Sequence, residues 1–187
     1  IKHDKKNTLK VILETFDELG YKYYYKILNS KDYNIPQNRQ RFFVIGFKDN
    51  SIDFSFPKPK TLEYEMSDFL IKDVDKKYYL SDKTVKYILR TEFNDMKFNV
   101  SLNNKIAHTL VSTMHKMHRA SIDNYIKYND KARRLTPREC LRLMGFPDNF
   151  NQVVSDTQMY KQVGNSIVVD VIEDIFKEII ATGVFNK

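Results

Sequence analysis

The sequence has 187 residues, 42% of them hydrophobic, which fits one or two domains with an apolar core and excludes a disordered chain. It contains no apolar run near the about 18 residues of a membrane span, and we expect no signal peptide. The net charge of +7 is compatible with a polyanionic partner. Because the first residue is Ile1 rather than Met, we expect a truncated piece of a longer protein.

Lysine and arginine are concentrated in two zones. Residues 22–48 hold six of them against one acidic residue, and residues 114–142 hold eight against three. Residues 49–77 hold five against seven. Two basic zones around an acidic one are typical of nucleic-acid binding, but also of ordinary solvated surface, so charge alone leaves both interpretations open.

Cysteine and histidine are scarce. Cys140 is the single cysteine, which excludes an intramolecular disulfide and predicts a cytosolic protein. His108, His115 and His118 have no cysteine or carboxylate at ligand spacing, so we expect no metal site.

The first elements predict the end of an α/β domain. Residues 8–19 have the apolar period of an amphipathic helix, which Gly20 is placed to end. Residues 21–28 form an aromatic, β-prone run. Residues 42–47 are nearly all apolar, which predicts a strand buried on both faces.

The middle of the chain is more polar. Residues 48–60 read as a loop with two prolines, and residues 61–133 as a second, smaller domain. Within that domain we expect a short helix at 81–90 and a strand at 106–114.

Two helices are expected near the end. Thr136 can cap a helix, Pro137 suits its first position, and Glu139 completes a capping box. This helix should run through Met144 and stop at Gly145. A final helix is expected to begin near Ser166.

Three segments are candidates for chemistry. In residues 36–41, Arg39 and Arg41 are expected to point to opposite faces of a strand entrance, one toward a ligand and one toward the scaffold, although two surface arginines are the simpler interpretation. In residues 134–147, Cys140 is expected to be a buried small residue rather than a nucleophile. Residues 162–166 form a turn that either caps a helix or holds a carboxylate.

Together these segments resemble the last three signature motifs of bacterial cytosine-5 DNA methyltransferases. DYNIPQNRQRFFVIGF is similar to the eighth motif, RRLTPRECLRLMGFPDNF to the ninth and YKQVGNSIVVDVIEDI to the tenth. IAHTL at 106–110 resembles the Thr-Leu element of the family's target-recognition region. The resemblance covers residues 1–48 and 105–180.

The resemblance implies an α/β architecture, with the C-terminal end of a Rossmann-like methyltransferase sheet and a small target-recognition domain. Residues 1–58 would end the catalytic domain, residues 59–155 would recognise DNA, and residues 156–187 would return to the catalytic domain. The expected partners are double-stranded DNA and an N-terminal catalytic half.

The resemblance also implies site residues. Arg41 would hydrogen-bond a flipped-out cytosine and Arg39 would support the active-site carboxylate. Asn165 and Ser166 would lie beside the methionine part of S-adenosylmethionine. The expected DNA contacts are Thr109, Leu110, Lys116, Arg119, Arg133 and Arg134.

The sequence departs from the family pattern in one large respect. It lacks the glycine-rich cofactor motif, the Pro-Cys motif of the nucleophile and the Glu-Asn-Val motif. We therefore expect a fragment, or one chain of a split enzyme, that is inactive alone and self-associates through an open sheet edge. The competing hypothesis is a DNA-binding module without chemistry.

Overall fold

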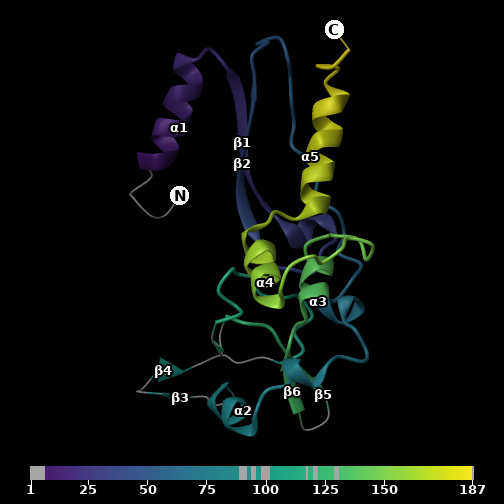
Figure 1. The fold of residues 1–187 in the computed structure, drawn as a ribbon. Coiled ribbons are helices and arrows are strands. Elements are labelled where there is room, and N and C mark those ends of the chain that lie inside the picture. The colour runs from purple at the N-terminus through teal and green to yellow at the C-terminus, as the bar shows by residue number, and fades with distance from the viewer. Residues whose placement is uncertain are drawn as a thin grey trace. The chain divides into compact units, whose positions relative to one another are not determined.

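A computed structural model describes residues 7–88, 92–93, 96–97, 102–116, 118–119, 122–128 and 131–186 (Figure 1). The helices are α1 (Asn7–Glu18), η2 (Ser30–Tyr33), η3 (Met66–Phe69), η4 (Lys76–Tyr78), α2 (Asp82–Ile88), α3 (Pro137–Arg142), α4 (Asp156–Asn165) and α5 (Val169–Ala181). The strands are β1 (Lys22–Asn29), β2 (Gln40–Phe47), β3 (Glu92–Phe93), β4 (Met96–Lys97), β5 (Tyr125–Tyr128) and β6 (Lys131–Arg134).

The chain divides into two compact units. Unit 1 contains residues 1–28, 40–58 and 173–187, and unit 2 contains residues 29–39 and 59–172. Among the described residues, no helix is both long and apolar enough to cross a membrane.

Unit 1 is built on β1 and β2, which form a two-stranded sheet. Helix α1 contacts the segment that follows it, with the Phe16 ring 5.8 Å from that of Tyr21 and 5.5 Å from that of Tyr23. The helix predicted at 8–19 and the strands predicted at 21–28 and 42–47 are thus confirmed within two residues at each end.

The prediction that β2 is buried on both faces was wrong for this chain. Phe43 and Phe47, which lie on one face, are its two buried side chains, and Phe42, Val44 and Ile45 are partly exposed. The covered face packs against the loop after β2, where the Phe47 and Phe54 rings lie 5.8 Å apart.

Unit 2 has its core between short helices and a hairpin. Strands β5 and β6 pair antiparallel, with Tyr125 opposite Arg134. Helices α3 and α4 lie side by side. The most deeply buried apolar side chains of this unit include Met66, Ile88, Ala107, Tyr125, Cys140, Leu141, Leu143, Met144 and Val163.

The start of α3 is the most accurately predicted feature. Thr136 accepts a hydrogen bond from the Glu139 backbone N–H, and the Glu139 carboxylate accepts one from the Thr136 N–H. This is the predicted capping box, with Pro137 at the first helical position. The helix ends at Arg142, earlier than predicted, and continues as a turn to Gly145, whose φ is +80°.

The strand predicted at 106–114 was wrong. Ala107 makes a single bridge to Gln37, and side-chain amides bind the next backbone groups. Asn124 Oδ1 accepts from the His108 N–H, and Gln37 Oε1 accepts from the Leu110 N–H. These side-chain amides bind backbone groups that a neighbouring strand would otherwise bind, so the segment is stable without pairing in a sheet. The helix predicted at 81–90 is α2, with residues 89–90 outside the described part.

Helix α4 was not predicted. A turn was predicted at residues 162–166, yet residues 162–165 lie inside a helix that Ser155 caps by accepting from the Gln158 N–H. The final helix, α5, begins at Val169 rather than near Ser166.

Candidate functional site

Arg39 connects three distant segments of unit 2. It lies directly before β2 and its side chain is 1% exposed. One terminal nitrogen, Nη1, donates to the Leu110 carbonyl at 2.6 Å. The other, Nη2, donates to the carbonyls of Gly164 at 2.9 Å and Ser166 at 2.6 Å. A buried guanidinium is stable only with such hydrogen bonds, so Arg39 fixes the backbone of these segments relative to one another.

Gln37 adds a second connection from the same loop. Its Nε2 donates to the Leu143 carbonyl at 2.7 Å, just after α3, and its Oε1 accepts from the Leu110 N–H at 3.0 Å. The amide is fully buried. The loop at 36–39, the segment at 109–111, the end of α3 and the end of α4 therefore meet at two buried side chains.

Gly164 is required where α4 meets the segment at 111–112. A Cβ built at this position would overlap the Ser112 backbone nitrogen and the Val111 carbonyl carbon. Backbone atoms cannot move aside as a flexible side chain can, so any larger residue would push the two segments apart.

Arg41 lies in unit 1, near the start of β2. Its side chain is half-buried, and Nη1 donates to the carbonyl of its own neighbour, Gln40, at 2.8 Å. Partial burial lowers the pKa of the guanidinium, which still stays charged at neutral pH. The expectation that Arg39 and Arg41 point to opposite faces of a strand rested on wrong reasoning, because residues two apart in a strand share a face. Arg39 also precedes the strand.

Asn165 and Ser166 end α4. Asn165 is its last residue and is exposed, and Ser166 is the C-cap, whose N–H donates to the Val163 carbonyl. The predicted position at the start of the last helix was wrong, because α4 precedes them. The Ser166 Oγ donates to the Ile167 carbonyl at 3.2 Å.

Arg133 was predicted to contact DNA, but its side chain lies in the core of unit 2. Its side chain is 5% exposed and that of Glu139 is fully buried. Arg133 Nη1 and Nη2 donate to the two Glu139 carboxylate oxygens at 2.8 and 2.7 Å. This bidentate pair leaves no charge for a phosphate, so Arg133 is part of the core.

Leu110 is likewise a core residue, with a side chain 2% exposed. Its backbone N–H donates to Gln37 Oε1, and its carbonyl accepts from Arg39 Nη1. Thr109 beside it is half-buried, and its Oγ1 donates to the Asn38 carbonyl at 2.6 Å. The hydrogen bonds of Thr109 and of the Leu110 backbone therefore align the segment with the loop at 36–39.

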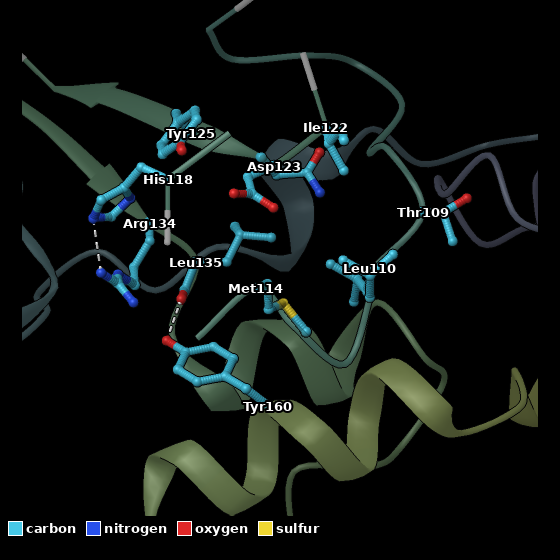
Figure 2. A pocket seen from close by; sticks show the side chains of 12 residues that line it. Thr109, Leu110, Met114, His118, Ile122, Asp123, Tyr125, Arg134, Leu135 and Tyr160 are labelled. Carbon is cyan, nitrogen blue, oxygen red and sulfur yellow. Dashed lines mark hydrogen bonds between the residues drawn. The ribbon is translucent and has the colours of Figure 1, made fainter. Parts of the chain in front are cut away.

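Three predicted basic contacts remain accessible to different extents. Lys116 is exposed. Arg119 Nη2 donates to Asp123 Oδ1 at 2.9 Å, which offsets its charge. Arg134 is half-buried and Nη2 lies 3.0 Å from His118 Nε2. Figure 2 shows Arg134 and His118 at one side of a pocket lined also by Tyr125, Leu135 and Tyr160.

Cys140 is fully buried inside α3, as predicted. Burial and the neighbouring Glu139 raise the pKa of its thiol well above the ordinary value. A buried, protonated thiol cannot act as a nucleophile. In the part of the chain that the structure describes, no cluster of histidine, cysteine and carboxylate side chains could hold a metal ion.

Sequence reasoning missed three of these residues. Gln37 sits inside the PQNRQR segment, but nothing in a single sequence marks a glutamine as buried. Gly164 was considered only as part of the turn predicted at residues 162–166. His118 was considered only as a metal ligand. No pattern in the sequence separates buried Arg133 from half-buried Arg134, because burial along β6 does not alternate.

The fold is shared with methyltransferases. The methyltransferase EhMeth of Entamoeba histolytica superposes with a TM-score of 0.75 at 19% identity, over 94% of this chain and 58% of that one. The Dnmt2 methyltransferase of S. pombe gives 0.77 at 17% identity, over 96% and 64%. The chain belongs to the C-5 cytosine-specific DNA methylase family, whose model matches residues 1–181.

Curated relatives agree with the family. The Type II methyltransferase M.MspI of Moraxella sp is 39% identical over 181 residues, which are 96% of this chain and 43% of the relative. M.HhaI of Haemophilus parahaemolyticus is 34% identical over 92% of this chain and 58% of its own length. The chain thus spans about half the length of these relatives.

Proposed function

We propose that this chain is the DNA-recognising part of a DNA (cytosine-5-)-methyltransferase, which also completes the sites for the flipped cytosine and for S-adenosylmethionine. The observation that carries the proposal is the convergence at Arg39. The segments similar to the eighth and tenth motifs, and the Thr-Leu segment, meet at its guanidinium. A module that only bound DNA would not need these segments joined around one buried cation.

Arg41 is the proposed contact to the cytosine. During attack on the ring, negative charge develops on the base, and a donor placed there lowers the barrier. The Arg41 guanidinium is half-buried, and its Nη1 donates to the adjacent Gln40 carbonyl. Partial burial strengthens a charged donor, because less water screens it.

Asn165 and Ser166 are the proposed contacts to S-adenosylmethionine. Asn165 is exposed at the C-terminal end of α4, where helix carbonyls favour a cationic group such as an ammonium. Its side-chain amide can both donate and accept. The backbone of this turn is held by Arg39, so Asn165 is presented from a fixed position. When bound, S-adenosylmethionine would supply the methyl group.

The chain supplies no nucleophile for this reaction. Its single cysteine, Cys140, is buried with a raised thiol pKa. We therefore propose that it is inactive alone and works with an N-terminal catalytic half, either on one longer chain or as a separate subunit. Unit 1 exposes large apolar side chains, among them Val11, Leu19 and Ile27, each more than half exposed, which supports contact with such a half or, without it, self-association.

DNA binding is proposed to rest on exposed and half-buried cations of unit 2, Lys116 and Arg134 among them. Such contacts are to phosphates and are largely independent of sequence. Specificity is expected from other side chains within residues 62–133, the region whose exchange for that of a relative should change the target sequence.

A salt titration tests the DNA-binding claim. The affinity of the chain for a duplex oligonucleotide, measured by fluorescence anisotropy, should fall linearly on a log–log plot against salt, with a slope of about −0.9 per phosphate contacted. Lys116→Ala should make that slope shallower. Lys10→Ala, an exposed lysine of unit 1 paired with Glu14, is the control. Binding that is insensitive to salt would refute the proposal.

A further inference from the structure

His118 and Arg134 form a contact that the proposed function does not use. Arg134 lies at the end of β6, opposite Tyr125 of β5. Its Nη2 is 3.0 Å from His118 Nε2, and the His118 ring lies 6.0 Å from that of Tyr125 at a tilt of 42°. Figure 2 shows the imidazole beside the Tyr125 ring and its Nε2 directed at the guanidinium.

The chemistry of the two groups fixes the state of the histidine. A guanidinium has only donors and keeps its proton in proteins. His118 Nε2 must therefore be the acceptor, which requires a neutral imidazole with its proton on Nδ1. A protonated imidazole would set two cations and two donors against each other, and the contact would be lost.

The surroundings favour the neutral form. Burial lowers the pKa of His118 below its ordinary value, Arg134 lowers it further, and Asp123 opposes them with a smaller effect. Asp123 is already held by the backbone N–H and the guanidinium of Arg119. The other titratable groups that line the same pocket are Tyr125 on β5 and Tyr160 on α4, whose hydroxyl donates to the Leu135 carbonyl.

The pocket beside the pair is small, with a volume of about 20 Å³, where one water molecule needs about 10–15 Å³. Among the residues that line it, His118 is the one that binds the Arg134 guanidinium. An Arg134 side chain released by His118 would therefore lose its single orientation.

We propose that His118 is a positioning residue for DNA binding: its neutral imidazole accepts a hydrogen bond from Arg134 and holds that guanidinium in one orientation for a phosphate, and protonation of His118 releases it. This inference rests on the proposed DNA contact of Arg134. Holding the side chain in place removes an ordering cost of binding worth about three- to tenfold in affinity.

The test compares duplex-DNA affinity from about pH 5 to about pH 8 at constant ionic strength, the range in which histidine titrates. The variants are His118→Gln, whose amide oxygen can still accept but does not titrate, His118→Phe, which cannot accept, and Arg134→Met. His115→Gln is the matched control, because His115 Nδ1 lies 2.9 Å from the Ser112 carbonyl oxygen rather than near a guanidinium.

We expect His118→Phe to bind about three- to tenfold more weakly at the upper pH, and Arg134→Met to lose at least as much, because it removes the proposed contact itself. The double variant should bind no more weakly than Arg134→Met. The unmodified chain should lose affinity as the pH falls, more steeply than His118→Gln, and the control should keep the unmodified profile. The pKa of His118, followed by NMR without DNA, should rise in Arg134→Met.

Two results would overturn the inference and they are distinguishable. If Arg134→Met binds DNA as well as the unmodified chain, the proposed phosphate contact is absent, and the inference falls with it. If Arg134→Met weakens binding but His118→Gln keeps the full pH dependence, or the pKa of His118 does not respond to Arg134→Met, only the positioning role is refuted. The NMR titration and the His118→Gln profile decide this even where His118→Phe folds poorly.

Discussion

Arg39 and Gly164 are 125 residues apart in the sequence, and Arg39 Nη2 donates to the Gly164 carbonyl oxygen at 2.9 Å. Gly164 is also the residue whose missing side chain lets α4 approach the Val111–Ser112 backbone. The same two residues therefore set both the distance and the orientation of these segments, and each is expected to be sensitive to substitution for a different physical reason.

Arg39→Met should destabilise unit 2 severely. It removes the donor from the buried carbonyls of Leu110 and Gly164 and from the partly buried carbonyl of Ser166, and each buried acceptor left without a partner costs about 1–3 kcal/mol. We expect the free energy of unfolding in urea to fall by at least about 3 kcal/mol. Arg41→Met is the control and should change it by no more than about 0.5–1 kcal/mol. Equal effects of the two substitutions would show that Arg39 does not hold the segments.

Gly164→Ala should separate α4 from the segment at 111–112. The added methyl meets backbone atoms, and overpacking of this kind typically costs about 1–3 kcal/mol, occasionally more. Gly20→Ala is the matched control, because its Cβ would be 3.9 Å from Lys48 Nζ and only the left-handed backbone, φ +68°, is strained. Thermal unfolding should show a larger loss of stability for Gly164→Ala than for Gly20→Ala. In the complete enzyme, Gly164→Ala should also weaken S-adenosylmethionine binding. Unchanged cofactor binding would show that Gly164 does not support that site.

Glu139→Gln should be far more damaging than an ordinary loss of one surface ion pair. Glu139 neutralises buried Arg133, accepts from the Thr136 N–H at the start of α3 and accepts from the Ile71 N–H at 2.8 Å. Leaving a buried cation unpaired costs about 3–5 kcal/mol. The double variant Glu139→Gln/Arg133→Met should recover part of the lost stability, because it no longer holds an unpaired buried cation. Glu173→Gln on the exposed side of α5 should be nearly neutral. No recovery in the double variant would contradict the account of the pair.

The elements predicted best are those whose cause is local. The capping box of Thr136 and Glu139 marks the start of α3 within a single turn of sequence, and the apolar period of residues 8–19 marks α1. The strand at 106–114 was predicted wrongly because what binds its backbone, Gln37 and Asn124, is distant in the sequence. Local patterns carry no information on such partners.

The candidate site, too, was predictable only where the cause is local in the sequence. The motif-like segments identify Arg39 and Arg41 as the arginines to consider, but only the fold separates buried Arg39 from half-buried Arg41. Helix α4 was missed because Gly164 interrupts its apolar pattern, and the reason for that glycine is the backbone of residues 111–112. The burial of Arg133 was not predicted, because its counter-charge, Glu139, had been interpreted only as a helix cap.

Arg41→Ala in the complete enzyme should lower turnover much more than DNA affinity. A donor to a developing charge typically contributes about 3–4 kcal/mol to the barrier, or about 100–1,000-fold in rate. Single-turnover kinetics with saturating DNA separate the two effects. Should the affinity fall while the rate per bound complex is unchanged, Arg41 is a phosphate contact and not a contact to the base.

The central claim is that this chain provides the recognition and closing parts of a cytosine-5 methyltransferase, and that the nucleophile comes from elsewhere. Transfer of labelled methyl groups from S-adenosylmethionine to duplex DNA tests it most directly, with the chain alone and with an N-terminal catalytic half supplied. We predict no incorporation by the chain alone, since Cys140 is buried, and 5-methylcytosine as the product once that half is present. Methylation by the chain alone, or a product other than 5-methylcytosine, would contradict the account.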